Sequence, residues 1–336
     1  MLCRTASDLY WAARNIERAE NTARLLDVTL RIAMLPHRLD RAKASAGPWR
    51  RALEALDLAE DFLHRYGRID AESVVRHLVL SADNPGSIYR CLRDARENAR
   101  AQRVAITSEM YEDLNSSWLE MRSFDSARIH TQGLASTLEW VKHRSASFRG
   151  VTIGTLGRGE GYQFLQLGSF IERADWAIRL LDIASSDSEL PDTGEARDAV
   201  QYFQWSALLQ ALSAFETYRR CYRESVKPGL VADLMLLQPD NPCSLQTCAD
   251  TLHSVLRNLA GNDSLQAVRL AGQLSARARY ARIDEVIAGG LERWLQETMA
   301  QLIGLGEEIH RQFMLATDTT PIVAPAMARA RSQWQA

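Results

Sequence analysis

One helical segment occurs twice in this chain. "IERAENTARLLDV" at 16–28 and "IERADWAIRLLDI" at 171–183 share Ile-Glu-Arg-Ala and, after four differing residues, Arg-Leu-Leu-Asp. Agreement of this kind between distant segments indicates an internal duplication. Because each copy of a duplicated helix has to bury a matching face, the repeat constrains the fold more than any other feature of the sequence.

The duplication extends beyond this segment. "WRRALEAL" at 49–56 faces "WSALLQAL" at 205–212, and "LSADNPGSI" at 80–88 faces "LQPDNPCSL" at 237–245, in the same order and at nearly the same spacing. We therefore predict two copies of one helical unit. Their boundaries are 1–148 for the half with Glu17-Arg18, 149–160 for a Gly-rich connection, 161–315 for the half with Glu172-Arg173, and 316–336 for an extended or disordered tail.

The rest of the chain also has a helical pattern. Apolar residues recur at a period near 3.6, and the few prolines fall between the helical patterns rather than inside them. This predicts an all-α fold, a multi-helix bundle built from two pseudo-symmetric helical halves. Local predictions are a helix from the Asp-Asn-Pro at 83–85 to about Met121, one over 134–148, a brief extended piece at 151–153, and two final helices within 264–314.

Composition argues against several classes of protein. The formal charge is −2 and the pI is near 6.4, so the chain lacks the excess of positive charge that is typical of nucleic-acid-binding proteins. The sequence has no long uncharged apolar window for a membrane span, and its charged, amphipathic start is unlike a signal peptide. The five cysteines form no CxxC pair, which argues against a zinc ribbon or a thioredoxin-like motif. We expect a reduced, cytoplasmic location.

The repeated helix carries a charged stripe. A helical wheel places Glu17, Glu20, Arg24 and Asp27 on one face with Arg18 beside it, and Glu172, Asp175, Arg179 and Asp182 in the same geometry with Arg173. On a face that contacts only solvent, Glu, Lys, Gln and Arg could replace one another freely, and the two copies would then differ. Because both copies keep acids and bases at matching positions, we predict a buried polar seam or site. Buried charges must be paired. A structural seam and a catalytic pair both fit this pattern.

Other chemistry is less well supported by the residues. Carboxylates on facing helices could bind a divalent metal through oxygen, but di-metal bundles use Glu-x-x-His, which neither copy contains, and the arginines already neutralise the acids. We therefore predict no cofactor and no metal. Cys91 and Cys248 fall at equivalent helical positions and are expected to be small core residues. The segment 95–100 places Arg96, Glu97 and Arg100 on a polar helical face.

Long dispersed segments resemble the alpha-E family, a bacterial all-helical domain of unknown function with a Glu-Arg motif. They include "MLCRTASDLYWAARNIERAENTARLLDV", "ARENARAQRVAITSEMYEDLN" and "GTLGRGEGYQFLQLGSFIERADWAIRLLD". The resemblance places the family's characteristic positions at Glu17, Arg18, Glu20, Arg24, Glu172, Arg173, Asp175 and Arg179, and at Arg96, Glu97, Asn98 and Arg100 in the middle helix. The chain departs from the family at Gly159, between Arg158 and Glu160, where the family tends to carry Asp, and at Trp176, where it often carries Asn.

The resemblance implies a context. Alpha-E proteins are typically encoded beside, or fused to, a circularly permuted ATP-grasp protein and a transglutaminase-like cysteine peptidase, which suggests amide or peptide chemistry on a small peptide. We expect a helical accessory, scaffold or co-catalytic partner of such a ligase. The alternatives are a peptide-binding module without turnover, or a stand-alone enzyme using the Glu/Arg stripes as acid and base. A Glu beside Arg stays ionised, which suits binding an amine better than donating a proton.

Overall fold

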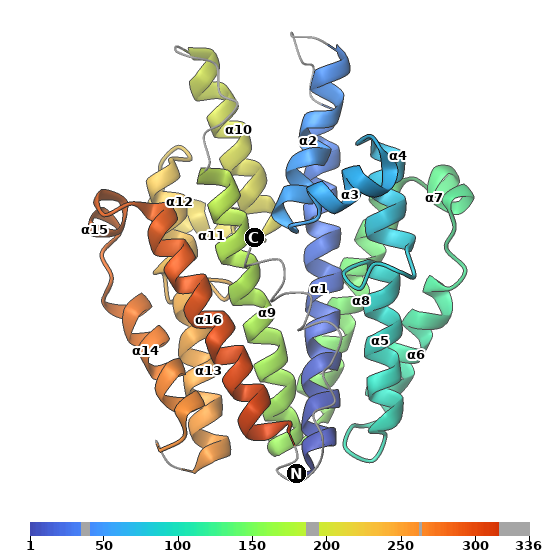
Figure 1. The fold of residues 1–336 in the computed structure, drawn as a ribbon, viewed down its shortest axis with the longest axis vertical. Helices are drawn as coiled ribbons and strands as arrows, with labels where there is room; N and C mark the ends of the chain where they lie inside the picture. The colour runs from blue at the N-terminus through green and yellow to red at the C-terminus, as the bar shows by residue number, and fades with distance from the viewer. Residues whose placement is uncertain (35–40, 186–194, 262–263, 316–336) are drawn as a thin grey trace.

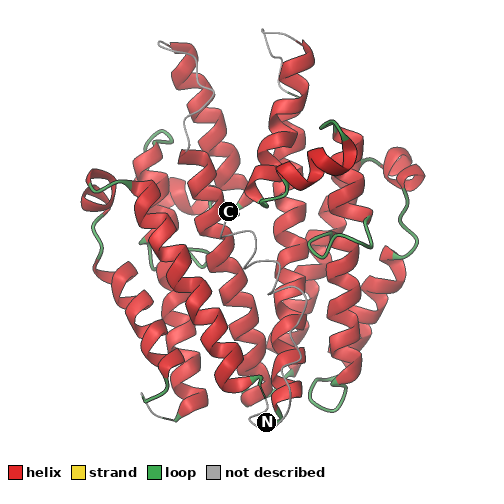
Figure 2. Cartoon of the chain, viewed as in Figure 1, coloured by secondary structure: helices red, strands yellow, loops and turns green. Residues whose placement is uncertain are grey.

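The computed structural model describes residues 1–34, 41–185, 195–261 and 264–315, which form helices and the turns between them (Figures 1 and 2). The elements of the first part are α1 (Cys3–Ala33), α2 (Arg41–Ala55), α3 (Ala59–Tyr66), α4 (Ala71–Val75), the π-helical turn η1 (Arg76–Leu80), α5 (Ile88–Ala101), α6 (Ser108–Met121), α7 (Ser126–Gln132) and α8 (Leu134–Thr155). Those that follow are α9 (Glu160–Ser185), α10 (Glu195–Ala211), α11 (Phe215–Tyr222), α12 (Pro228–Leu236), α13 (Leu245–Ala260), α14 (Gln266–Tyr280), α15 (Ile283–Ala288) and α16 (Leu291–Phe313). The all-α prediction is confirmed.

Two long parallel helices, α1 and α9, form the centre of the bundle and begin at the same end (Figure 1). On one side α5 and α8 pack against α1, and α6 packs against both of them. On the other side α13 and α16 pack against α9, and α14 packs against both of them. The two sets follow the same order along the chain. The pseudo-symmetry of the halves stays a prediction from the sequence.

The two central helices meet backbone to backbone at Gly168 on α9. A Cβ atom placed on Gly168 would lie 2.1 Å from the carbonyl oxygen of Tyr10 and 3.2 Å from the Cβ of Ala13. Tyr10 and Ala13 are buried in the same contact. Only a residue without a side chain fits there, so Gly168 fixes how closely α1 and α9 approach.

The Asp-Asn-Pro segments do not start helices at their prolines. Asn84 accepts from the backbone N–H of Gly86 at 2.9 Å and donates to the carbonyl of His77, forming a turn that ties η1 to α5. Ser87 is the N-cap, accepting from the Arg90 N–H at 3.0 Å, so α5 begins at Ile88. The prediction of a start at 83–85 was wrong because the Asn side chain satisfies the turn instead of the helix. Asn241 and Ser244 make the same contacts before α13.

Other boundaries differ from the sequence predictions. The extended piece at 151–153 was wrong, because α8 continues through the Gly-rich stretch to Thr155 and only 156–159 separate it from α9. Glycine lowers helix stability by about 1 kcal/mol per residue, a cost that the contacts of the α8 side chains offset. The helix expected to reach Met121 is broken between α5 and α6, and the last stretch contains α15 in addition to two long helices. The tail at 316–336 lies outside the described residues.

Within the described ranges, none of the helices combines the length and apolar character needed to cross a lipid bilayer.

Replacing Gly168 with Ala should lower the free energy of unfolding by about 3 kcal/mol, because the added methyl would collide with backbone atoms of Tyr10. Urea denaturation followed by circular dichroism measures the change. Gly154→Ala on α8 is the matched control: its Cβ would meet nothing within 4 Å, so the variant should be as stable as the parent or more so. Equal stability of Gly168→Ala and Gly154→Ala would contradict the close crossing.

Candidate functional site

The two Glu-Arg motifs exchange partners across the central helices. Arg18 on α1 donates to both carboxylate oxygens of Glu172 on α9, at 2.6 and 2.9 Å. In return Arg173 donates to both oxygens of Glu17, at 2.6 and 3.1 Å. Each motif therefore supplies the acid of one bidentate pair and the base of the other. Such paired N–H···O bonds are among the stronger polar contacts in proteins.

This exchange follows from the parallel arrangement of α1 and α9. Parallel helices that cross near Gly168 bring the two motifs to the same level, so adjacent acid and base on one helix meet base and acid on the other. Glu17 and Glu172 are only 3% and 5% exposed. A carboxylate so far from water must be paired and hydrogen-bonded, which the bidentate arginines provide.

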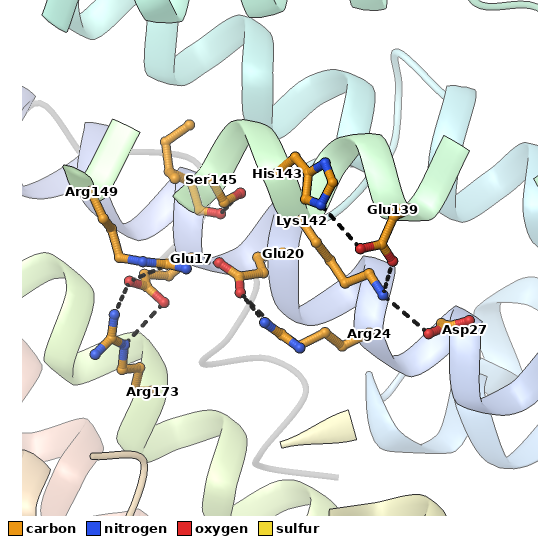
Figure 3. Close-up of polar contacts among 11 residues, drawn as sticks. Glu17, Glu20, Arg24, Asp27, Glu139, Lys142, His143, Ser145, Arg149 and Arg173 are labelled. Atoms are coloured by element: carbon orange, nitrogen blue, oxygen red, sulfur yellow. Dashed lines mark hydrogen bonds and ion pairs between the residues drawn. The ribbon is translucent and has the colours of Figure 1, made fainter. Parts of the chain in front are cut away.

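Helix α8 covers the rest of the α1 stripe with cations (Figure 3). Arg149 contacts Glu17 at 3.5 Å and donates to Glu20, which also accepts from Arg24 at 2.6 Å. Seven residues earlier on α8, Lys142 lies 3.2 Å from Asp27. Glu20 and Asp27 are also seven residues apart, which is about two helical turns. Each of these acids on α1 therefore lies beside a cation of the antiparallel helix α8.

The α9 stripe is paired differently: Glu172 and Asp175 bind arginines of α1 and of α9 itself. Glu172 receives a second arginine, Arg14 on α1, at 2.9 Å. The Arg14 guanidinium also donates to the Tyr10 hydroxyl and lies 5.0 Å from the centre of the Trp11 ring. Further along, Arg179 pairs with Asp175 at 2.8 Å and reaches Asp57 in the turn after α2.

The arginines keep the buried acids ionised. Burial alone would raise the pKa of Glu172, but Arg18 and Arg14 outweigh it and hold that pKa at about 2. Burial likewise opposes ionisation of Glu20, and Arg149 and Arg24 reverse the effect and lower its pKa. Asp182 behaves in the opposite way: burial, Glu292 and Asp57 together raise its pKa. Glu172 and Glu20 are therefore fixed anions and poor proton donors at neutral pH.

The core cysteines are as expected. Cys91 and Cys248 are fully buried, which confirms their prediction as small core residues. Burial raises the pKa of the Cys91 thiol to about 12 and also raises that of Cys248. Since the thiolate is the reactive form, neither thiol is suited to nucleophilic chemistry.

The secondary candidates lie away from the seam. On α5, Arg96 and Arg100 both pair with Glu97, and Arg96 donates to Asn115 on α6 at 3.1 Å. Asn98 is a partly buried residue of the same helix. Arg158 lies in the turn before α9, donating to the Ile153 carbonyl and stacking 4.2 Å from the Tyr162 ring centre. The structure does not bring these residues together with the Glu-Arg pairs.

Four residues of the network were not found by sequence reasoning, namely Arg14, Asp57, Lys142 and Arg149. Arg14 lies one turn before Arg18, and Lys142 and Arg149 repeat the seven-residue spacing of Glu20 and Asp27. That spacing is a usable signal for an antiparallel partner helix, although it becomes informative only once α8 is known to extend past 148. Asp57 lies in a turn, where no periodicity marks it.

The chemistry open to this cluster is limited by its pairing. Among the described residues no group of three or more His, Cys, Asp and Glu side chains is arranged to hold a metal ion. Glu17, Glu20 and Glu172 each accept from two arginines. These contacts direct the carboxylate oxygens toward arginines, most of them on neighbouring helices, where they stabilise the packing of the bundle. The arrangement is suited to holding helices in register.

The fold and its central pairs define an all-helical protein organised around a duplicated Glu-Arg motif. The family model described as Alpha-E, a predicted alpha-helical domain with a conserved ER motif, matches residues 1–314, and the chain belongs to that family.

Curated relatives share part of their length with this chain. It is 28% identical over 321 residues to uncharacterized proteins of Mycobacterium bovis and Mycobacterium tuberculosis strain CDC 1551. The match covers 88% of this chain but only 35% of each relative, so the chain spans about a third of the proteins it resembles. No solved structure gives a significant match.

Replacing Glu172 with Gln should lower the free energy of unfolding by about 3–5 kcal/mol, because Arg14 and Arg18 would lose their buried counter-ion. Glu97→Gln removes an acid from an exposed pair and should cost less than about 1 kcal/mol. Both are measured by urea denaturation at neutral pH. Similar small losses for the two variants would contradict a structural role for the seam.

The same pair predicts a pH dependence. The pKa of Glu172 is about 2 in the folded chain against an ordinary 4.5, so its ionised form stabilises the fold fully above about pH 4.5. That contribution is lost as the pH falls from there towards 2. Denaturation midpoints measured between about pH 6 and 3 should fall more steeply for the parent than for Glu172→Gln. Parallel curves would show that Glu172 titrates normally.

Proposed function

We propose that this chain is a helical accessory or co-catalytic partner of a circularly permuted ATP-grasp amide or peptide ligase. It would act with a transglutaminase-like peptidase in a bacterial system that makes or modifies a peptide. The observation that carries the proposal is the reciprocal Glu-Arg pairing. It supports a scaffold because the residues characteristic of the family bind one another across α1 and α9.

A stand-alone enzyme would need different electrostatics. General acid–base catalysis is most efficient when a group has a pKa near the working pH. Glu172 instead has a pKa of about 2, and the Cys91 thiol has one of about 12. The acids and thiols of the centre thus favour a rigid support over a reacting group.

The relatives add independent support for a partner. In the mycobacterial proteins the matched region makes up 35% of the chain, so in those proteins an Alpha-E-like region is covalently joined to a larger remainder. A unit that works beside other domains in one chain can work beside separate proteins in another. This favours the partner function over an isolated module.

The direct test is reconstitution with the ATP-grasp protein and the transglutaminase-like protein encoded in the same genome. Affinity purification of the tagged chain should recover the ATP-grasp protein in fixed proportion. The ligase should then consume ATP about tenfold faster, or more, when this chain is present. Unchanged ATP consumption with and without the chain would contradict the proposal.

A seam variant separates support from catalysis. At a temperature where circular dichroism shows it folded, Glu172→Gln should still stimulate the ligase to within about twofold of the parent, because the charge serves the fold. Complete loss of product formation by the folded variant would favour the alternative hypothesis, in which the chain is itself an enzyme that uses Glu172 in acid–base catalysis. Glu54→Gln is the control for a neutral amide in place of an acid, because Glu54 lies in an exposed pair with Arg50 on α2, outside the candidate residues.

A further inference from the structure

A polar groove lies between α13 and α14. These two helices belong to the set on the α9 side of the bundle (Figure 1). The groove encloses about 730 Å³, within the range of small-molecule sites in proteins. It is lined by Asp250, His253, Ser254, Arg257, Asn258, Gly261, Gly272, Ser275, Ala276, Arg279 and Tyr280. None of these residues belongs to the Glu-Arg network, so the groove needs its own explanation.

The corresponding helix of the first half carries larger buried residues. In the register that pairs Asn84 with Asn241, the buried residues of α6 and α14 coincide. Met110, Leu114, Trp118 and Met121 stand opposite Ala267, Ala271, Ser275 and Ala278. Trp118 packs on Tyr89 with ring centres 4.9 Å apart, whereas the shorter Ser275 fills no such space. The lining of the groove on α14 is therefore built from smaller residues than those at the matching positions of α6.

Small residues of α14 also make room for a histidine. In the same register Gly272 stands opposite Asn115, the residue that binds Arg96 in the first half. A Cβ placed on Gly272 would lie 3.2 Å from Nε2 of His253, so the imidazole rests directly against α14. Gly272 therefore lets a ring lie in the groove where the first half has an Arg–Asn contact.

The groove contains an arginine held in place by its one acid, Asp250. Both oxygens of Asp250 accept hydrogen bonds: Ser275 donates to Oδ1 at 2.5 Å and Arg279 to Oδ2 at 2.9 Å. This contact anchors the Arg279 guanidinium, while the side chain stays 52% exposed. Arg279 can therefore use its remaining N–H groups to bind a ligand.

We propose that this groove binds the carboxylate of a short peptide or similar carboxylic acid, with Arg279 as the principal anchor. An arginine held at one end by Asp250 is pre-oriented, and a guanidinium can bind a carboxylate through two parallel N–H···O bonds. Asn258 and Ser254 offer hydrogen bonds to an extended amide chain. The exposed ring of Tyr280 offers an apolar surface against which the apolar part of the ligand can pack. The inference does not depend on a ligase partner.

Calorimetric titration of the full chain tests this. The probes are acetyl-Gly-Phe, acetyl-Gly-Glu and acetyl-Gly-Ala as free acids, the same peptides as C-terminal amides, and inorganic phosphate. At least one acid should bind, and its amide should bind about tenfold more weakly or worse, since a hydrogen-bonded charge contributes about 1.5–3 kcal/mol. No acid binding up to about 10 mM, equal binding of acid and amide, or binding of phosphate alone would overturn the proposal.

Two variants of α14 locate the site. Arg279→Gln should weaken binding of the acid about tenfold or more, because it removes the anchoring charge. Arg269→Gln removes an equal charge from an exposed position on the same helix outside the groove, and should change the affinity less than about twofold. Equal effects of the two variants would show that binding is non-specific attraction and would also overturn the proposal.

Discussion

The buried exchange of Glu17 with Arg173 and of Glu172 with Arg18 is the interaction on which the rest of this structure depends. Two carboxylates almost without contact with water cannot stay charged unless cations reach them. The cations come from the opposite helix, so α1 and α9 must be parallel, in this register and at this distance. Gly168 makes that distance attainable by removing the side chain at the crossing.

The surrounding helices follow from this centre. Helix α8 runs antiparallel to α1, so that Arg149 and Lys142 reach Glu20 and Asp27 (Figure 3). This explains why α8 stays helical through a glycine-rich segment where local propensity is low. On the other side Glu172 draws its second cation, Arg14, from α1 itself. The two stripes, similar in sequence, are thus neutralised in different ways.

Much of this could be predicted from the sequence, because helical periodicity and the repeat depend on local spacing. The all-α class and the shared face of Glu17 and Glu20 were accessible in this way. The partners of these acids were not, since Arg149 and Arg14 become neighbours of the acids only through packing of distant helices. The helix starts at Ile88 and Leu245 were missed because Asn84 and Asn241 satisfy turns rather than helix ends.

The structure separates two kinds of polar residue. Those of the seam are buried and bound to one another, which gives a rigid core and favours a supporting function beside a ligase. In the α13–α14 groove, Arg279 is held by Asp250 and remains half exposed, which suits the binding of a ligand. The buried residues of α14 are small, whereas those of α6, its counterpart in the predicted repeat, are large. Duplication followed by divergence would produce this combination of a retained centre and an altered surface.

The most direct test of the central claim is a double-mutant cycle on one exchanged pair. The free energy of unfolding is measured for the parent, Glu17→Gln, Arg173→Gln and the double variant. If the pair holds α1 and α9 together, each single variant is strongly destabilised and the double is much less so than their sum, with a coupling energy of about 2 kcal/mol or more. Additive losses, with coupling below about 0.5 kcal/mol, would show that the two residues stabilise the fold separately and would contradict the account.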